Sequence, residues 1–241
     1  MFNDVITHLV LRFRDMLYWD SRRLTYPKLM EYAEAIRRAG GIDGIWGFID
    51  GTQRAICRPE KDQQVMYSGY KRNHTFKCQA IITPDGIISH LCGPFEGKLG
   101  DWRMWNLSNL EQTLHIIMNA PDSLGGTERI LFIYRDLAYI PAYGIMGGYK
   151  ARVNHPLTEQ QKAMNAIMSE VRVSVEHGFG KVMQNWSYIG FRNGLKIGLS
   201  PVGAYYMVSV LLTNIHTCLR GSQTSAQFEI NPPSLEEYFD Q

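Results

Sequence analysis

The chain has 241 residues, of which 45% are apolar and 20% charged, with 13 Tyr and 10 Phe. This is the composition of an ordinary globular protein, and it excludes an intrinsically disordered chain. The formal net charge is only +2, so a basic surface for nucleic acid would have to come from local clustering. At this length we expect one main domain with extensions.

Cysteine usage and hydropathy both indicate an intracellular protein. The four cysteines include no CxxC pair, so we expect reduced thiols and no zinc site. Charged residues between positions 4 and 15 interrupt the apolar N-terminus, which argues against a signal peptide. The apolar stretch 201–219 contains Asn214 and His216 and is predicted to be a buried helix. No membrane contact is expected.

Helical periodicity opens the chain. Apolar residues recur at intervals of three and four up to position 17, and a second amphipathic stretch ends at Gly40 and Gly41. The pattern predicts two helices. We assign residues 1–44 to an N-terminal helical extension that serves packing and not base recognition.

A strand-rich block follows, made of "GIWGFID", "FKCQAIITPDG" and "GIISHLCGPFEG". The "PDG" turn at 84–86 links antiparallel strands, so the block predicts a three-strand meander. The stretch 105–120 then has the period of one helix that covers a face of the sheet. Its apolar side comprises Leu107, Leu110, Leu114 and Ile117.

The next strand, "RILFIYRD", closes on Asp136, just as the first apolar run closes on Asp50. We therefore predict two buried strands that end in acids. The glycine-rich stretch 144–156 is predicted to be a loop. The polar, proline-containing segment 221–241 is predicted to be a flexible tail.

A long helix is predicted to begin at Thr158, which forms a capping box with Gln161. Glu176 lies beside the apolar stripe of this helix, one turn after Arg172. An ion pair of Arg172 with Glu176 or a neighbouring acid is the simplest role for that arginine.

Each acid alone has an ordinary structural role: Asp50 in a turn, Asp136 at a helix cap, and Glu176 in solvent or paired with Arg172. Together they indicate more. Neighbouring strands lie about 4.8 Å apart, so acids at the same ends of two adjacent parallel strands can reach one cation. A third carboxylate from a helix completes an all-oxygen site, which suits Mg²⁺ or Mn²⁺.

Four segments carry a resemblance to a known family: "FIDGTQRAICRP", "YSGYKRNHTFKCQAIITPDGIISHLCGPFEGKLGDWRMW", "IYRDLAYI" and "RVSVEHGFG". In order and spacing they resemble the DDE-type transposases of the PIF/Harbinger group, from about residue 45 to about residue 190. The resemblance implies an α/β, RNase H-like domain over residues 45–220. Its mixed sheet would combine the antiparallel meander with parallel strands and be flanked by helices.

The resemblance also implies the catalytic residues. By motif, Asp50, Asp136 and Glu176 would be the catalytic and metal-binding acids, with two Mg²⁺ or Mn²⁺ ions for hydrolysis and strand transfer at DNA phosphodiester bonds. Asp101 is a rival for the second place. Its other possible roles are to position substrate or to form the N-cap of the helix after it.

The stretch "YKRNHTFK" interleaves positive side chains with Tyr70 and Phe76, a pattern suited to phosphate contact and base stacking. The alternative is a solvated strand edge guarded against aggregation. The candidate DNA-binding residues are Lys71, Arg72, His74 and Lys77.

Two positions depart from the family pattern. Arg135 stands where relatives usually have glycine before the second aspartate, and Gly100 stands where histidine is frequent. Strand alternation should point Arg135 away from Asp136. The alternative to an active nuclease is therefore a domesticated transposase that binds DNA or protein without cutting. The resemblance further implies a nuclear location, a Myb-like helper protein and a possible homo-oligomer.

Overall fold

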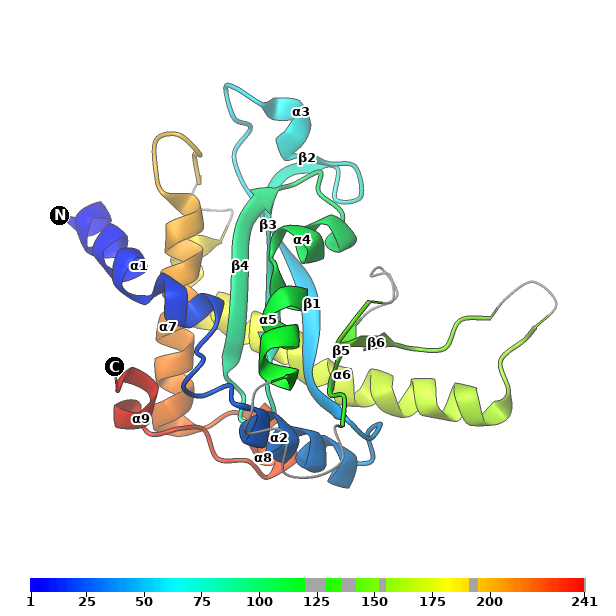
Figure 1. Ribbon diagram of the computed structural model, residues 1–241. Helices are drawn as coiled ribbons and strands as arrows, with labels where there is room; N and C mark the ends of the chain where they lie inside the picture. The colour runs from blue at the N-terminus through cyan, green and yellow to red at the C-terminus, as the bar shows by residue number, and fades with distance from the viewer. Residues whose placement is uncertain (120–128, 136–141, 152–154, 191–194, 241) are drawn as a thin grey trace.

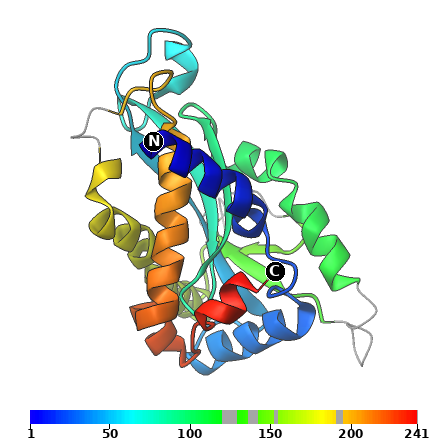
Figure 2. The same ribbon diagram turned by 90° about the vertical axis from the view of Figure 1, so that its left-hand side faces the viewer.

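The computed structural model describes residues 1–119, 129–135, 142–151, 155–190 and 195–240, without the side chains of 174–176. One mixed sheet forms the centre, and helices cover both of its faces (Figures 1 and 2). The strands are β1 (Ile45–Ala55), β2 (Tyr67–Ser68), β3 (Asn73–Ile82), β4 (Ile88–Glu96), β5 (Phe132–Arg135) and β6 (Ile145–Gly147).

The strand order is β2-β3-β1-β5-β6, and β4 also pairs with β3. The meander predicted from sequence is confirmed, because β1 with β3 and β3 with β4 are antiparallel. β5 runs parallel to β1, and β6 runs parallel to β5. β1 therefore lies in the interior of the sheet, which explains its run of buried residues from Ile45 to Ile49.

Helices on the two faces come from different parts of the chain. In Figure 1, α5 lies over the near face of the sheet and α6 runs behind it. Figure 2 shows α7 and α6 on one side of the strands and α4 and α5 on the other. The helices are α1 (Phe2–Tyr18), α2 (Tyr26–Arg38), α3 (Gln63–Met66), α4 (Asp101–Leu107), α5 (Leu110–Met118), α6 (Glu159–Asn185), η2 (Ser187–Ile189), α7 (Val202–Arg220), α8 (Gln223–Phe228) and α9 (Leu235–Phe239).

The two N-terminal helices are confirmed and pack on the rest of the fold. α1 packs along α7 and the edge strand β4, and α2 packs on β1. Leu17, near the end of α1, and Leu24, in the segment between the two helices, are buried in the common core.

The single helix expected over 105–120 is wrong. α4 ends at Leu107 and α5 begins at Leu110, because Asn109 takes a left-handed conformation with φ 52°. The break turns Leu107 outward, where it is 54% exposed, while Leu110 and Leu114 stay buried. The apolar residues from 107 to 117 keep helical spacing, although the helix breaks at Asn109. Apolar spacing alone does not reveal such a break.

The glycine-rich stretch 144–156 is not all loop. Ile145–Gly147 form β6, which pairs in parallel with β5. The strand was missed because its three residues are too few for alternation to be recognised.

The segment from 221 onward, expected to be loose, packs onto the core. It forms α8 and α9, each opened by a capping box. Phe228 stacks on Phe48 of β1 with ring centroids 6.1 Å apart. The hydroxyl of Tyr238 accepts a hydrogen bond from Asn214 Nδ2 at 2.9 Å. A few apolar anchors in a polar segment are enough to hold it.

α7 is long and apolar enough to span a membrane by length and composition. More than half of its apolar window is buried inside the fold, as predicted, against α1, α6, β4 and α9. Its core contacts account for its apolar character.

Candidate active site

Asp50 lies in the middle of β1 and not at its end. The strand continues to Ala55, so the expected strand end at the acid is wrong. The Asp50 side chain is 26% exposed, and its Oδ1 accepts a hydrogen bond from the Gly51 N–H at 2.8 Å. The apolar run stops here because solvent reaches this part of the strand.

Arg172 of α6 places a positive charge beside Asp50. Its Nη1 lies 3.7 Å from Asp50 Oδ2, and its side chain is 22% exposed. The sequence predicts an ion pair of Arg172 with Glu176 or a neighbouring acid; among the described side chains its partner is Asp50, on a different element. Sequence periodicity places Asp50 on a strand and Arg172 on a helix. It does not show that the two elements bring these side chains together, so this partner was not predicted.

The parallel register places the end of β5 beside Asp50. Arg135, the last residue of β5, pairs with Ile49, the residue directly before Asp50. Asp136 is the next residue in the chain and lies outside the described residues. The predicted parallel arrangement of the strand that bears Asp50 and the strand that leads to Asp136 is confirmed.

α6 carries Glu176, whose side chain is outside the described part of the structure. The helix begins with the predicted capping box, in which Thr158 Oγ1 accepts from the Gln161 N–H at 3.2 Å. In its C-terminal half α6 approaches the sheet closely, because a Cβ added to Gly178 would lie only 2.3 Å from Cδ1 of Ile82 in β3. The backbone that bears Glu176 is thereby held close to the sheet.

Asp101 lies across β1 from Asp50. A Cβ at Gly51 would meet Asp101 Oδ1 at 2.9 Å, and successive residues of a strand face opposite sides of the sheet. Asp101 is the first residue of α4, and Gly100 is the N-cap, so the N-cap role weighed for Asp101 is wrong. A side chain at the glycine of "DGT" would have to displace the Asp101 carboxylate, so Gly51 lets Asp101 approach the strand closely.

Arg135 faces away from Asp50. It shares a sheet face with its partner Ile49, and it is 5% exposed. Its guanidinium lies over Gly147 of β6, where an added Cβ would be 2.9 Å from Arg135 Cζ. The bulky cation therefore leaves the Asp50 side of the sheet clear.

The four candidate DNA-binding residues separate into two groups. Lys77 is 9% exposed, and its Nζ donates to the Leu99 carbonyl oxygen at 2.6 Å, so it holds the loop before α4. The others lie at the hairpin between β2 and β3. Lys71 lies over the ring of Tyr70, 5.3 Å from its centroid, and Tyr70 is 87% exposed. His74 meets the Tyr67 ring edge-on, and Arg72 occupies the turn at φ 50°.

Metal-binding capacity rests on residues that are only partly described. Within the described ranges, no group of three or more His, Cys, Asp or Glu side chains could hold a metal ion. Of the three predicted acids, only the Asp50 carboxylate is placed, and it offers hard oxygen donors to solvent. All four cysteines are free thiols.

The mixed sheet carries Asp50 on β1, and α6, which packs on this strand, bears Glu176 in its sequence. Residues 49–214 match the family model of the DDE superfamily endonuclease, and the chain belongs to that family. The matched range includes Asp50, Asp101, Asp136 and Glu176.

One curated relative is the probable transposase for insertion sequence element IS702 from Microchaete diplosiphon. It is 26% identical over 129 residues, which cover 54% of this chain and 43% of the relative. The chain thus matches less than half the length of that protein. No solved structure matches the chain.

Proposed function

We propose that the protein is a metal-dependent DNA endonuclease that performs transposase-like hydrolysis and strand transfer. Asp50, Asp136 and Glu176 would be its catalytic acids on an RNase H-like core. The observation that carries the proposal is the parallel register of β1 and β5. Ile49 pairs with Arg135, so the residues that follow each partner in sequence are two acids of the family motif.

The donor set fits Mg²⁺ or Mn²⁺, since all three side chains are carboxylates. A bound pair of such ions would activate the attacking hydroxyl and stabilise the leaving oxygen. The chain's own contribution is orientation. The Gly51 N–H fixes Oδ1 of Asp50. Arg172 offsets the charge of Oδ2, which makes a half-buried carboxylate tolerable when no metal ion is bound.

Nicking of supercoiled plasmid in Mg²⁺ or Mn²⁺ tests the proposal. Replacing Asp50 or Asp136 by Asn, or Glu176 by Gln, should lower the rate about 10³-fold or more. Glu170→Gln is the matched control, because Glu170 is an exposed acid on the same helix as Glu176. Persistent nicking in Asp136→Asn would remove Asp136 from the mechanism.

A second candidate function is a DNA- or protein-binding module that no longer cuts. The contact between Arg172 and Asp50 favours it, because a fixed guanidinium beside this carboxylate competes with a divalent ion. Calorimetry with Mn²⁺ separates the two. Uptake that is lost in Asp50→Asn supports the nuclease, whereas no uptake at millimolar Mn²⁺ supports the module.

The PIF/Harbinger subtype is a narrower proposal that rests on the sequence resemblance. It entails a Myb-like helper protein, a homo-oligomer and a nuclear location. Co-purification with a Myb-like domain, sedimentation of the purified chain and imaging of a fluorescent fusion test these three statements separately.

A further inference from the structure

A pocket of about 520 Å³ lies where α6, α7, α8 and the β3–β4 turn meet. α6 packs on both α7 and α8, and α8 lies at the C-terminal end of α7 (Figures 1 and 2). The turn closes one wall tightly, because a Cβ added to Gly86 would collide with Oγ of Ser222. The described lining includes neither Asp50 nor Arg172, so the pocket is separate from the candidate active site.

The lining is polar and carries charge of one sign. Among its described residues are the ammonium of Lys181 and no Asp or Glu. His177, the other basic residue, is exposed. Neutral hydroxyls and amides supply most of the remaining polar groups, from Thr213, Thr217, Ser222, Gln184, Asn185 and Gln223. A concave surface with a cation and no carboxylate attracts an anion.

Lys181 has two hydrogen bonds, and both go to neutral oxygens. Its Nζ donates to Thr217 Oγ1 at 3.3 Å and to the Gly221 carbonyl oxygen at 3.2 Å. Charge-assisted hydrogen bonds are usually shorter, about 2.7–2.9 Å. Burial lowers the pKa of Lys181, because the ammonium loses water and no carboxylate offsets that loss. Its charge is therefore only partly compensated.

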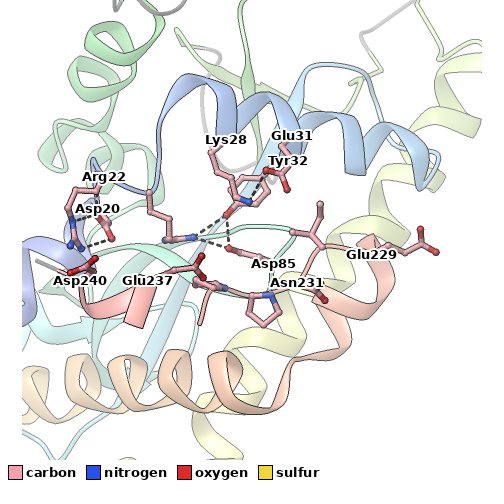
Figure 3. Close-up of a pocket in the computed structure, with 14 residues that line it drawn as sticks. Asp20, Arg22, Lys28, Glu31, Tyr32, Asp85, Glu229, Asn231, Glu237 and Asp240 are labelled. Atoms are coloured by element: carbon pink, nitrogen blue, oxygen red, sulfur yellow. Dashed lines mark hydrogen bonds and ion pairs between the residues drawn. The ribbon is translucent and has the colours of Figure 1, made fainter. Parts of the chain in front are cut away.

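The bases of another pocket show the contrast. That pocket lies between α2, the β3–β4 turn and the C-terminal segment, has about 760 Å³, and mixes acids with bases (Figure 3). Each base there has its own carboxylate, in the pairs Arg22–Asp20, Arg23–Asp85 and Lys28–Glu31. The positive charges of that pocket are already neutralised, whereas the charge of Lys181 is not.

The size of the pocket and its donors indicate the kind of anion. Its volume of about 520 Å³ is typical of small-molecule sites, whereas a DNA duplex would meet only its opening. The amides of Gln184 and Asn185 and the hydroxyl of Ser222 can donate hydrogen bonds in addition to the Lys181 ammonium. Several donors around one cation suit a phosphate group, which has three strong acceptor oxygens.

We infer that this pocket binds the phosphate group of a small molecule and that Lys181 neutralises it. The hydrogen bond to the carbonyl of Gly221, the C-cap residue of α7, keeps the ammonium at the pocket wall. The remaining volume takes whatever group the phosphate carries. The inference does not depend on the nuclease proposed above, because the described lining contains none of its acids.

Calorimetry on the whole chain in EDTA and without DNA tests the inference, with inorganic phosphate and glycerol 3-phosphate as the probes. Lys181→Met should weaken the binding of both by about tenfold or more, because the bound anion loses its counter-charge. Tighter binding of glycerol 3-phosphate than of phosphate would support a monoester as the ligand. Equal affinities would support free phosphate.

Gln184→Glu tests the charge without removing the lysine. Gln184 is exposed and lies three residues after Lys181 on α6, so a carboxylate there can pair with the ammonium. It should weaken phosphate binding by about tenfold or more, with the helix intact by circular dichroism. Gln160→Glu is the matched control, because it makes the same charge change at an exposed position near the start of the helix. It should bind like the wild type.

Unchanged binding in Lys181→Met and Gln184→Glu would overturn the inference, and so would the absence of binding at millimolar concentrations of both probes. In the second case Lys181 would serve only to cap α7. Weaker binding of a labelled DNA duplex by Lys181→Met, with phosphate binding unchanged, would also overturn it, because the lysine would then contact the polymer. Nicking is not measured in these experiments, so this site and the nuclease can fail separately.

Discussion

Single residues show how far a local signal can mislead. Asp85 belongs to the "PDG" turn, which from sequence is only a surface connection, yet it is 1% exposed. It accepts a hydrogen bond from Arg23 Nη1 at 2.9 Å. It accepts another from the Tyr32 hydroxyl at 2.6 Å (Figure 3). The turn thereby ties the segment between α1 and α2 to the meander.

Asp85→Ala should lower the free energy of unfolding by about 3–5 kcal/mol, because it leaves the Arg23 charge buried without its carboxylate. Urea denaturation measures the loss. The comparison is Asp15→Ala, which breaks an ion pair with Arg14 on the surface and should cost at most about 1 kcal/mol. Similar losses in both variants would show that the Arg23–Asp85 pair is no more than a surface pair.

His90 predicts a pH dependence of stability. Burial lowers the pKa of His90 to about 4, and its Nδ1 contacts the Tyr18 carbonyl oxygen at 2.6 Å. Among the described residues, Nε2 has no hydrogen-bond partner, so a proton there would be unsatisfied. The unfolded chain binds the proton first, near pH 6.5.

The free energy of unfolding should therefore fall by up to about 3 kcal/mol from this residue as pH drops from about 6.5 to about 4. His90→Gln should remove that part of the pH dependence. Urea midpoints measured at several pH values check it, and parallel curves for both proteins would contradict the role of His90.

At the scale of elements, α6 packs closely against the sheet at a glycine. α6 meets the sheet at Gly178, against Cδ1 of Ile82, whereas two residues later nothing lies within 4 Å of a Cβ at Gly180. An added methyl group would therefore clash at Gly178 but meet open space at Gly180.

Gly180→Ala should stabilise the fold by up to about 1 kcal/mol through helix propensity. Gly178→Ala should destabilise it by about 1–3 kcal/mol through overpacking. Ile82→Val removes the Cδ1 atom that Gly178→Ala would meet, so the double variant should recover most of the stability. A double-mutant cycle from urea denaturation checks this coupling, and additive effects would argue against close docking at Gly178.

At the scale of the whole molecule, both ends of the chain pack on the central sheet and its helices. Near the N-terminus, Asn3 Oδ1 accepts from the Tyr205 hydroxyl of α7 at 2.7 Å. Near the C-terminus, Phe228 is 2% exposed and lies on β1 through Phe48. The assignment of residues 45–220 to one domain stays a prediction.

Phe228→Ala should cost about 3–5 kcal/mol, the usual cost of removing a buried aromatic side chain. Gln227→Ala is the control, because Gln227 is the exposed neighbour in the same short helix. Thermal or urea unfolding measures both. A small effect at Phe228 would restore the expectation of a loosely held tail.

Periodicity and capping patterns in the sequence determined the meander, the N-terminal helices and the capped start of α6, because these depend on local patterns. The candidate acids came from the family resemblance and stay a prediction. Only the tertiary structure decided that Asp50 lies within β1, that Asp101 lies on the other face, that Arg172 reaches Asp50 and that Lys77 is buried. Those facts depend on strand register and on helix docking, which bring together residues as far apart in the chain as Asp50 and Arg172. No local pattern in the chain encodes such a pairing.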